Sequence, residues 1–153
     1  MACDIHVWAE RREDGCWEVV GLMPKALERQ DYGMFGFLAG VRNYAAVTPI
    51  AECRGLPRDA SVGVRDAVED CAGVHSRSWL SLEELLLFNY DQTMEDRRVT
   101  RQIGPVGFDG GATAKPGGGQ QTTYREFLGE HFLKALEELK AAGAERVVFW
   151  FDN

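Results

Sequence analysis

The sequence has no apolar run of the roughly 18 to 20 residues that cross a bilayer, and its first residues lack the basic segment of a secretory signal. The four cysteines, Cys3, Cys16, Cys53 and Cys71, include no C-x-x-C pair. A disulfide framework is therefore not expected. We expect a soluble cytoplasmic protein with reduced thiols and no membrane partner.

Basic residues are scarce, since 17 Lys and Arg face 24 Asp and Glu for a formal net charge of −7. A surface for duplex nucleic acid needs clustered Lys and Arg on one face, so this partner is not expected. Net charge governs long-range steering and does not fix the composition of one cleft. A locally basic pocket for a small anion remains open.

Alternation at the start of the chain and an apolar run at its end predict two strands. Residues 3–10 alternate with period two, the Asp14-Gly15 pair supplies a turn, and residues 3–20 therefore predict a β-hairpin. The segment 146–151 is almost wholly apolar, which is typical of a central strand.

Capping residues predict the helices. The expected helices cover about 32–42 after Asp31, a short segment from Asp59 or Ser61 to before Gly73, about 82–90 after the Ser81/Glu84 capping box, and Thr123 to Gly143. Seven of the 17 glycines lie between residues 104 and 121, which predicts a mobile loop. With no repeat or boundary visible, 1–153 is expected to be one α+β domain. Its single sheet includes the hairpin and the central C-terminal strand, packed by three to four helices.

Asp4, His6 and Trp8 share one face of the first strand, where a carboxylate can orient or charge an imidazole. If the first and last strands are neighbours, Asp152 joins Asp4 and His6. The alternatives are an exposed polar face for Asp4 and His6 and a solvated chain end for Asp152.

The segment His75-Ser76-Arg77-Ser78-Trp79 precedes a capped helix and is expected to be a polar loop. Unpaired N–H groups and the helix dipole at such a point favour a phosphate or carboxylate. The alternative is ordinary helix-entry chemistry, with Trp79 in the core. Arg42, Tyr44 and Arg54 are further candidates for stacking on a base or forking to a phosphate.

Two arrangements of metal ligands are conceivable. Cys3, His6, Cys71 and His75 resemble a two-Cys, two-His zinc set, but Cys3 and His6 face opposite sides of a strand. A looser set of Asp4, His6, His75 and Asp152 suits a hard or borderline divalent ion. No cofactor follows firmly from the sequence, and a divalent metal is an option.

Five blocks, CDIHVWAE, MFGFLAGVRNY, RGLPRD, HSRSWLSLEEL and VVFWFDN, resemble a family of small uncharacterised proteins of bacteriophage and prophage genomes. The resemblance spans nearly the whole chain and implies a place in the host cell cytoplasm. It transfers no catalytic residue, because the family has no settled activity. A phage setting implies a counter-defence role.

Three functions follow as hypotheses. The first is a binding protein that sequesters a phosphorylated nucleotide signal, a cyclic nucleotide or an ADP-ribose type, within one chain or at a homo-oligomer interface. The second is a phosphodiesterase or other hydrolase of such a ligand, with His6 or His75 as general base and Asp4 or Asp152 orienting it or holding a metal. The third is a protein-binding inhibitor of a host enzyme. In the first, the ligand residues would be Trp8, Arg42, Tyr44, Arg54, Ser76, Arg77, Ser78 and Trp79.

Overall fold

A computed structural model describes residues 2–103 and 107–153, with the backbone alone for 100–103 and 107–110. It has the expected α+β class, with helices and antiparallel strands in one chain. The chain forms two compact units. The first unit comprises Met1–Gln30, Cys53–Phe88 and Glu130–Asn153, and the second comprises Asp31–Glu52 and Asn89–Gly129. Within the described residues, no helix combines the length and the apolar character needed to cross a membrane.

The first unit contains a four-stranded antiparallel sheet with the order β2-β1-β8-β3. Its strands are β1 (Asp4–Glu13), β2 (Cys16–Val19), β3 (His75–Ser81) and β8 (Arg146–Asp152). The predicted hairpin is confirmed, since Asp14 and Gly15 have φ angles of 52° and 80° and Glu13 pairs with Cys16. Positive φ at both turn residues matches the right-handed twist of the two strands.

Strand β8 is central, as its apolar composition predicted, because β1 and β3 pair with its two edges. The expectation of a polar loop at residues 75–79 is wrong: these residues begin β3. A central strand needs a neighbour on each side, and β3 fills that place although His75 to Ser78 carry no apolar pattern.

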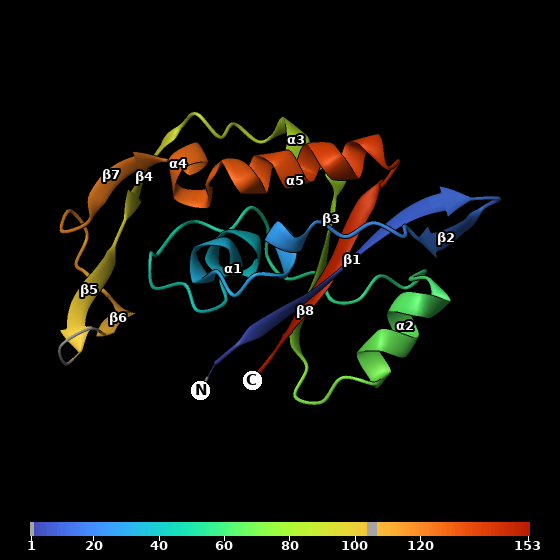
Figure 1. Ribbon diagram of the computed structural model, residues 1–153, viewed down its shortest axis with the longest axis horizontal. Helices are drawn as coiled ribbons and strands as arrows, with labels where there is room; N and C mark the ends of the chain where they lie inside the picture. Colours follow the sequence, from blue (N-terminus) through green and yellow to red (C-terminus); the bar gives the residue numbers. More distant parts are fainter. Residues whose placement is uncertain (1, 104–106) are drawn as a thin grey trace. The chain divides into compact units, whose positions relative to one another are not determined.

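Helices cover both faces of this sheet (Figure 1). Helix α2 (Val62–Glu69), capped by Ser61, packs through Val64 against Val148 and Trp150 of β8. The 3-10 helix η1 (Lys25–Glu28), α3 (Leu82–Leu87) and α5 (Glu130–Ala141) lie on the other face. Ser81 and Glu84 form the predicted capping box of α3, which ends before residue 90 because Phe88 adopts an extended ψ of 138°.

The second unit contains two small antiparallel pairs and two short helices. Strand β4 (Thr93–Asp96) pairs with β7 (Gln120–Thr123), and β5 (Arg98–Ile103) pairs with β6 (Gly107–Thr113). The helices are α1 (Tyr32–Ala39), capped by Asp31 as predicted, and α4 (Tyr124–Leu128), capped by Thr123. A Cβ atom on Gly36 of α1 would lie 2.6 Å from Asn43 Oδ1, so this glycine permits close packing.

Two sequence predictions differ from this unit. The glycine-rich segment 104–121 was expected to be a mobile loop, but 107–113 and 120–123 form strands that pair with β5 and β4. Glycine weakens a strand interior but keeps the backbone N–H and C=O groups that make the pairing. Residues 104–106 lie outside the described residues, and the mobility of the segment stays a prediction. The helix expected from 123 to 143 is divided into α4 and α5 by Gly129, whose φ of 85° and ψ of 156° are not helical.

Candidate functional site

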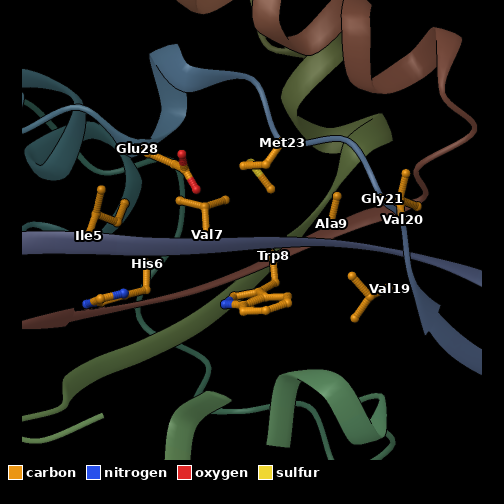
Figure 2. A pocket seen from close by; sticks show the side chains of 10 residues that line it. All are labelled: Ile5, His6, Val7, Trp8, Ala9, Val19, Val20, Gly21, Met23 and Glu28. Carbon is orange, nitrogen blue, oxygen red and sulfur yellow. The ribbon is translucent and has the colours of Figure 1, made fainter. Parts of the chain in front are cut away.

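The two terminal strands run side by side, as the sequence hypothesis required. In the β1–β8 register, Asp4 is opposite Asp152 and His6 is opposite Trp150. Residues directly opposite each other in an antiparallel pair point to the same face. His6, Trp8, Trp150 and Asp152 therefore share the face that α2 covers, and Figure 2 shows His6 and Trp8 on the opposite side of β1 from Ile5 and Val7.

Three potential metal ligands meet at the end of this face: His6, Cys71 and Asp152. His6 Nε2 and Asp152 Oδ2 are 2.8 Å apart and share a hydrogen bond. Cys71 Sγ lies 3.7 Å from His6 Nε2 and donates to Asp152 Oδ2 over 3.5 Å. We call this set the His6–Cys71–Asp152 centre.

Each member of the centre is held by a different segment. His6 projects from β1 and stacks on the buried Trp150 ring, with 5.8 Å between centroids and 14° between planes. Cys71 follows α2 at the point where the helix ends, and its N–H donates to Val68 O over 3.3 Å. The chain then turns at Gly73, whose φ of 71° places it against the backbone of Asn153 next to Asp152.

The Asp152 carboxylate is stabilised in its ionised form. The hydrogen bond from His6 is the largest influence and lowers the pKa of Asp152; the Cys71 thiol lowers it further, against the opposing effect of burial. The centre is open to solvent, because the His6 side chain is 39% exposed and that of Asp152 is 27% exposed. An ionised carboxylate, an imidazole and a thiol thus share one solvent-accessible point.

Asp4 lies beside the centre without joining it. Its side chain is exposed, and its Oδ1 accepts a hydrogen bond of 3.1 Å from Gln30 Nε2. Although Asp4 is opposite Asp152 in the register, the group of three donors does not include it.

His75 is on the other face of the sheet. It is opposite Phe151, and its ring stacks on the Phe151 ring at 6.1 Å. His75 Nδ1 is 3.0 Å from Ser76 Oγ, and its buried Nε2 has no hydrogen-bond partner among the described residues. The metal set of Asp4, His6, His75 and Asp152 is therefore not assembled, because the register of β3 turns His75 away from His6.

The anion site expected at residues 75–79 finds no support in the geometry. Ser78 is buried on the Phe149 side, and its Oγ accepts from the Arg54 N–H at 3.0 Å. Trp79 packs in the cluster beneath α2. In helix α3, which has six residues, Ser81 Oγ accepts from the Glu84 N–H, and the Leu82 N–H donates to the Glu145 carbonyl over 2.9 Å. Glu83 and Glu84 occupy the first turn of this helix. These carboxylates repel a phosphate at that point.

Two of the three arginine candidates, Arg54 and Arg42, have other partners. Arg54 stacks over the Trp79 ring at 4.8 Å and forms an ion pair with Glu84, which lowers the pKa of Glu84 to about 2. Arg42 belongs to the second unit, where it donates to the Tyr44 hydroxyl over 3.4 Å. Arg77 is exposed, and Ser76 adopts a φ of 52°.

A pocket of about 390 Å³ adjoins His6 in the first unit (Figure 2). It is lined by Ile5, His6, Val7, Trp8, Ala9, Val19, Val20, Gly21, Met23 and Glu28. No Lys or Arg is among these residues, and Glu28 supplies a carboxylate. The pocket suits a neutral or cationic group better than a phosphate.

Cys71 is the functional candidate that the sequence did not assign to a site. It appeared only in a zinc set with Cys3, but Cys3 is buried on the Ile5 side of β1 and cannot meet His6. The position of Cys71 depends on where α2 ends and how the chain turns at Gly73, and no local pattern encodes that geometry.

Comparison with family models, curated proteins and solved structures finds no match to this chain. The phage resemblance therefore stays a prediction.

Proposed function

We propose that the His6–Cys71–Asp152 centre binds one divalent metal ion, with Zn²⁺ as the first candidate, and that the protein is a metal-assisted hydrolase. One observation carries the proposal: an imidazole nitrogen, a thiol sulfur and a carboxylate oxygen from three segments all lie within 4.8 Å of one another. This is a suitable donor set for zinc, which accepts nitrogen, sulfur and oxygen ligands.

The distances fit a tetrahedral ion. With Zn–S of about 2.3 Å and Zn–N or Zn–O of about 2.0 to 2.1 Å, tetrahedral edges are about 3.5 Å from sulfur to nitrogen or oxygen and about 3.3 Å from nitrogen to oxygen. The distances of 3.7 Å and 3.5 Å from Cys71 Sγ already match. The 2.8 Å between His6 Nε2 and Asp152 Oδ2 reflects their hydrogen bond and would lengthen by about 0.5 Å.

A nucleophile–base triad fits less well. In such a triad the nucleophile and the orienting carboxylate use different nitrogens of the imidazole. Here Cys71 Sγ and Asp152 Oδ2 both approach Nε2 of His6. Three groups that converge on one point favour shared coordination over proton relay.

Three protein ligands leave a fourth tetrahedral position, and the exposure of His6 and Asp152 gives solvent access to it. A divalent ion in an open site polarises a phosphoryl or carbonyl oxygen and lowers the pKa of a bound water. The protein's part is to present Asp152 ionised, hold the His6 ring on Trp150 and fix Cys71 at the end of α2.

Binding without cleavage is the second candidate, because the pocket beside His6 and Trp8 has the size of a small-molecule site. A phosphorylated nucleotide stays a proposed ligand for either function. The Trp8 ring lines the pocket and offers a surface on which a base would stack, which supports such a ligand. The absence of Lys and Arg from the pocket lining weighs against it.

Metal binding is tested by titrating chelator-treated protein with Zn²⁺ against a chromophoric chelator, and with Co²⁺ for the thiolate charge-transfer absorption. We expect one equivalent per chain. Cys71→Ser and His6→Ala should weaken Zn²⁺ binding at least tenfold, and Cys71→Ser should also remove the charge-transfer band. Cys16→Ser, at an exposed cysteine of the hairpin, is the matched control. Unchanged affinity in both variants would overturn the metal proposal.

Hydrolysis is tested with zinc-loaded protein on a phosphate monoester, a phosphodiester, cyclic dinucleotides and ADP-ribose, followed by analysis of the ligand. Turnover that is lost in Cys71→Ser and retained in Cys16→Ser supports the hydrolase. A ligand recovered intact from a complex that needs His6 or Trp8 supports binding only. If the zinc-loaded protein neither converts nor binds any of these compounds, both proposed functions are contradicted.

A further inference from the structure

The second unit contains a pocket of about 350 Å³ with one arginine in its lining. Arg97 lies at the junction between β4 and β5. The lining residues are Ala46, Val47, Thr48, Thr93, Met94, Glu95, Arg97 and Tyr124. The pocket is independent of the His6–Cys71–Asp152 centre and of the function proposed for it.

The backbone of Arg97 is fixed on both sides. Its N–H donates to Ala45 O over 3.1 Å, and its carbonyl accepts from the Ala114 N–H at 2.8 Å. The side chain therefore starts from a defined point at the pocket.

The Arg97 guanidinium lacks the partners that neighbouring arginines have. Its Nε is buried and has no hydrogen-bond partner, and the described residues supply no carboxylate within ion-pair distance. In contrast, Arg98 pairs with Asp96 and Arg125 pairs with Asp91 in the same unit. An unpaired buried guanidinium nitrogen is unfavourable, so it calls for an acceptor.

The acidic residue of the lining is engaged elsewhere. Glu95 Oε1 accepts from the N–H groups of Gly117 and Gly119 at 2.9 Å and 3.0 Å. These bonds hold the Glu95 carboxylate at the 117–119 turn. The hydroxyl groups of Thr48, Thr93 and Tyr124 add neutral polar groups to the lining.

One wall of the pocket is preformed. Asn43 fastens the segment through two bonds to Val47, one from its Nδ2 to the Val47 carbonyl at 2.7 Å and one from the Val47 N–H to its Oδ1 at 3.0 Å. Ala46, inside this loop, has a φ of 53°, a conformation that L-residues other than glycine rarely adopt. Strain of this kind persists only where the surroundings enforce it.

We propose that this pocket binds a small oxyanion, a carboxylate or a phosphate monoester, through Arg97. An oxyanion would give the guanidinium the acceptors that the described residues do not supply, in the forked geometry that arginine prefers. The volume is at the lower end for small-molecule sites, so the ligand is a small metabolite.

The test is calorimetric titration of the full chain with inorganic phosphate and, separately, with succinate, which distinguishes the two sources of the oxyanion. We expect one site per chain for at least one of the two anions. Arg97→Met should weaken its binding at least tenfold. Arg125→Met, which removes the same charge from the same unit, should change it less than twofold. Equal binding by wild type and Arg97→Met, or no heat with either anion, would overturn the proposal.

Folding of the variants gives a second readout. Because Arg97→Met removes a buried donor without a partner, we expect its melting temperature without anion to equal or exceed that of the wild type. Arg97→Lys keeps the positive charge but loses the two parallel N–H donors of the guanidinium, and should weaken anion binding severalfold. A melting temperature of Arg97→Met well below that of the wild type would show that Arg97 serves the fold, and wild-type affinity in Arg97→Lys would exclude a forked contact.

Discussion

Two polar clusters lie on the same face of the β1–β8 pair, one near each end, and they differ in burial. Glu10 and Arg146, opposite each other in the register, are 0% and 6% exposed in their side chains. His6 and Asp152 at the other end are 39% and 27% exposed. The same strands thus hold one closed and one open polar cluster.

The closed cluster is fully paired. Arg146 Nε donates to Glu10 Oε1 over 2.6 Å, the Ser61 N–H donates to Glu10 Oε2 over 2.7 Å, and Arg146 Nη1 donates to Asp59 over 2.9 Å. The Arg146 guanidinium also lies 3.7 Å from the centre of the Trp17 ring. Every charge is used to join β1, β8 and the start of α2, which is a structural role.

The open cluster has the opposite character, because it gathers a soft sulfur, a borderline imidazole nitrogen and a hard carboxylate oxygen that are accessible and directed at one point. It can gain a ligand without losing a core contact. The difference in burial separates two roles. A chemical function on this sheet is expected at the accessible His6–Cys71–Asp152 centre, and the buried Glu10–Arg146 pair is expected to stabilise the fold.

The largest effect is expected from Glu10→Ala. Removing Glu10 leaves the buried Arg146 with only the exposed Asp59 carboxylate as a counter-charge and leaves the Ser61 N–H without its acceptor. Breaking a buried pair in this way typically costs about 3 to 5 kcal/mol. Urea unfolding measures the loss. Glu13→Ala, which breaks the exposed pair with Arg11, should cost less than about 1 kcal/mol. Similar losses in the two variants would show that burial of the Glu10–Arg146 pair does not set its contribution to stability.

The second-largest effect on stability is expected from adding Zn²⁺. A ligand that binds the native state alone stabilises it by about 2.7 kcal/mol at one hundred times its Kd. Zn²⁺ at that excess should raise the melting temperature of the wild type, and a chelator should reverse the rise. His6→Ala should show about half of this stabilisation or less, since a tenfold weaker site gives about 1.4 kcal/mol at the same Zn²⁺ concentration, while Glu13→Ala should respond like the wild type. A rise in His6→Ala as large as that of the wild type would place the metal elsewhere.

The backbone of the first unit was more predictable than its chemistry. The hairpin and the central strand 146–152 follow from local signals, a two-residue turn and an apolar run. Strand β3 was missed because it forms to pair with the open edge of β8, and the polar residues His75 to Ser78 give no local strand pattern. Local pattern identifies elements that fold by their own sequence and misses those that complete a sheet.

The candidate site shows the same limit. The pairing of His6 with Asp152 was foreseen because both lie on terminal strands whose adjacency could be guessed. Cys71 and Arg97 were not placed, since each depends on a turn between elements. The burial of Glu10 was also missed. Glu10 lies on the polar face of the first strand with Asp4 and His6, and only the covering helix α2 and Arg146 make that position interior.

The smallest effect is expected from the pH dependence of the Asp152 pair. The hydrogen bond from His6 lowers the pKa of Asp152 in the folded state, so its contribution is present above the unfolded pKa of about 4 and is lost as pH falls through the lower folded value. Asp152→Asn should therefore lose less stability than the wild type between pH 6 and pH 3, by under about 1 kcal/mol because the pair is half-exposed. Unfolding curves at both pH values measure this difference. Asp59 and Glu84 are unchanged in the variant, so the difference reports the His6–Asp152 pair, and identical losses would mean that this pair does not favour the ionised form of Asp152.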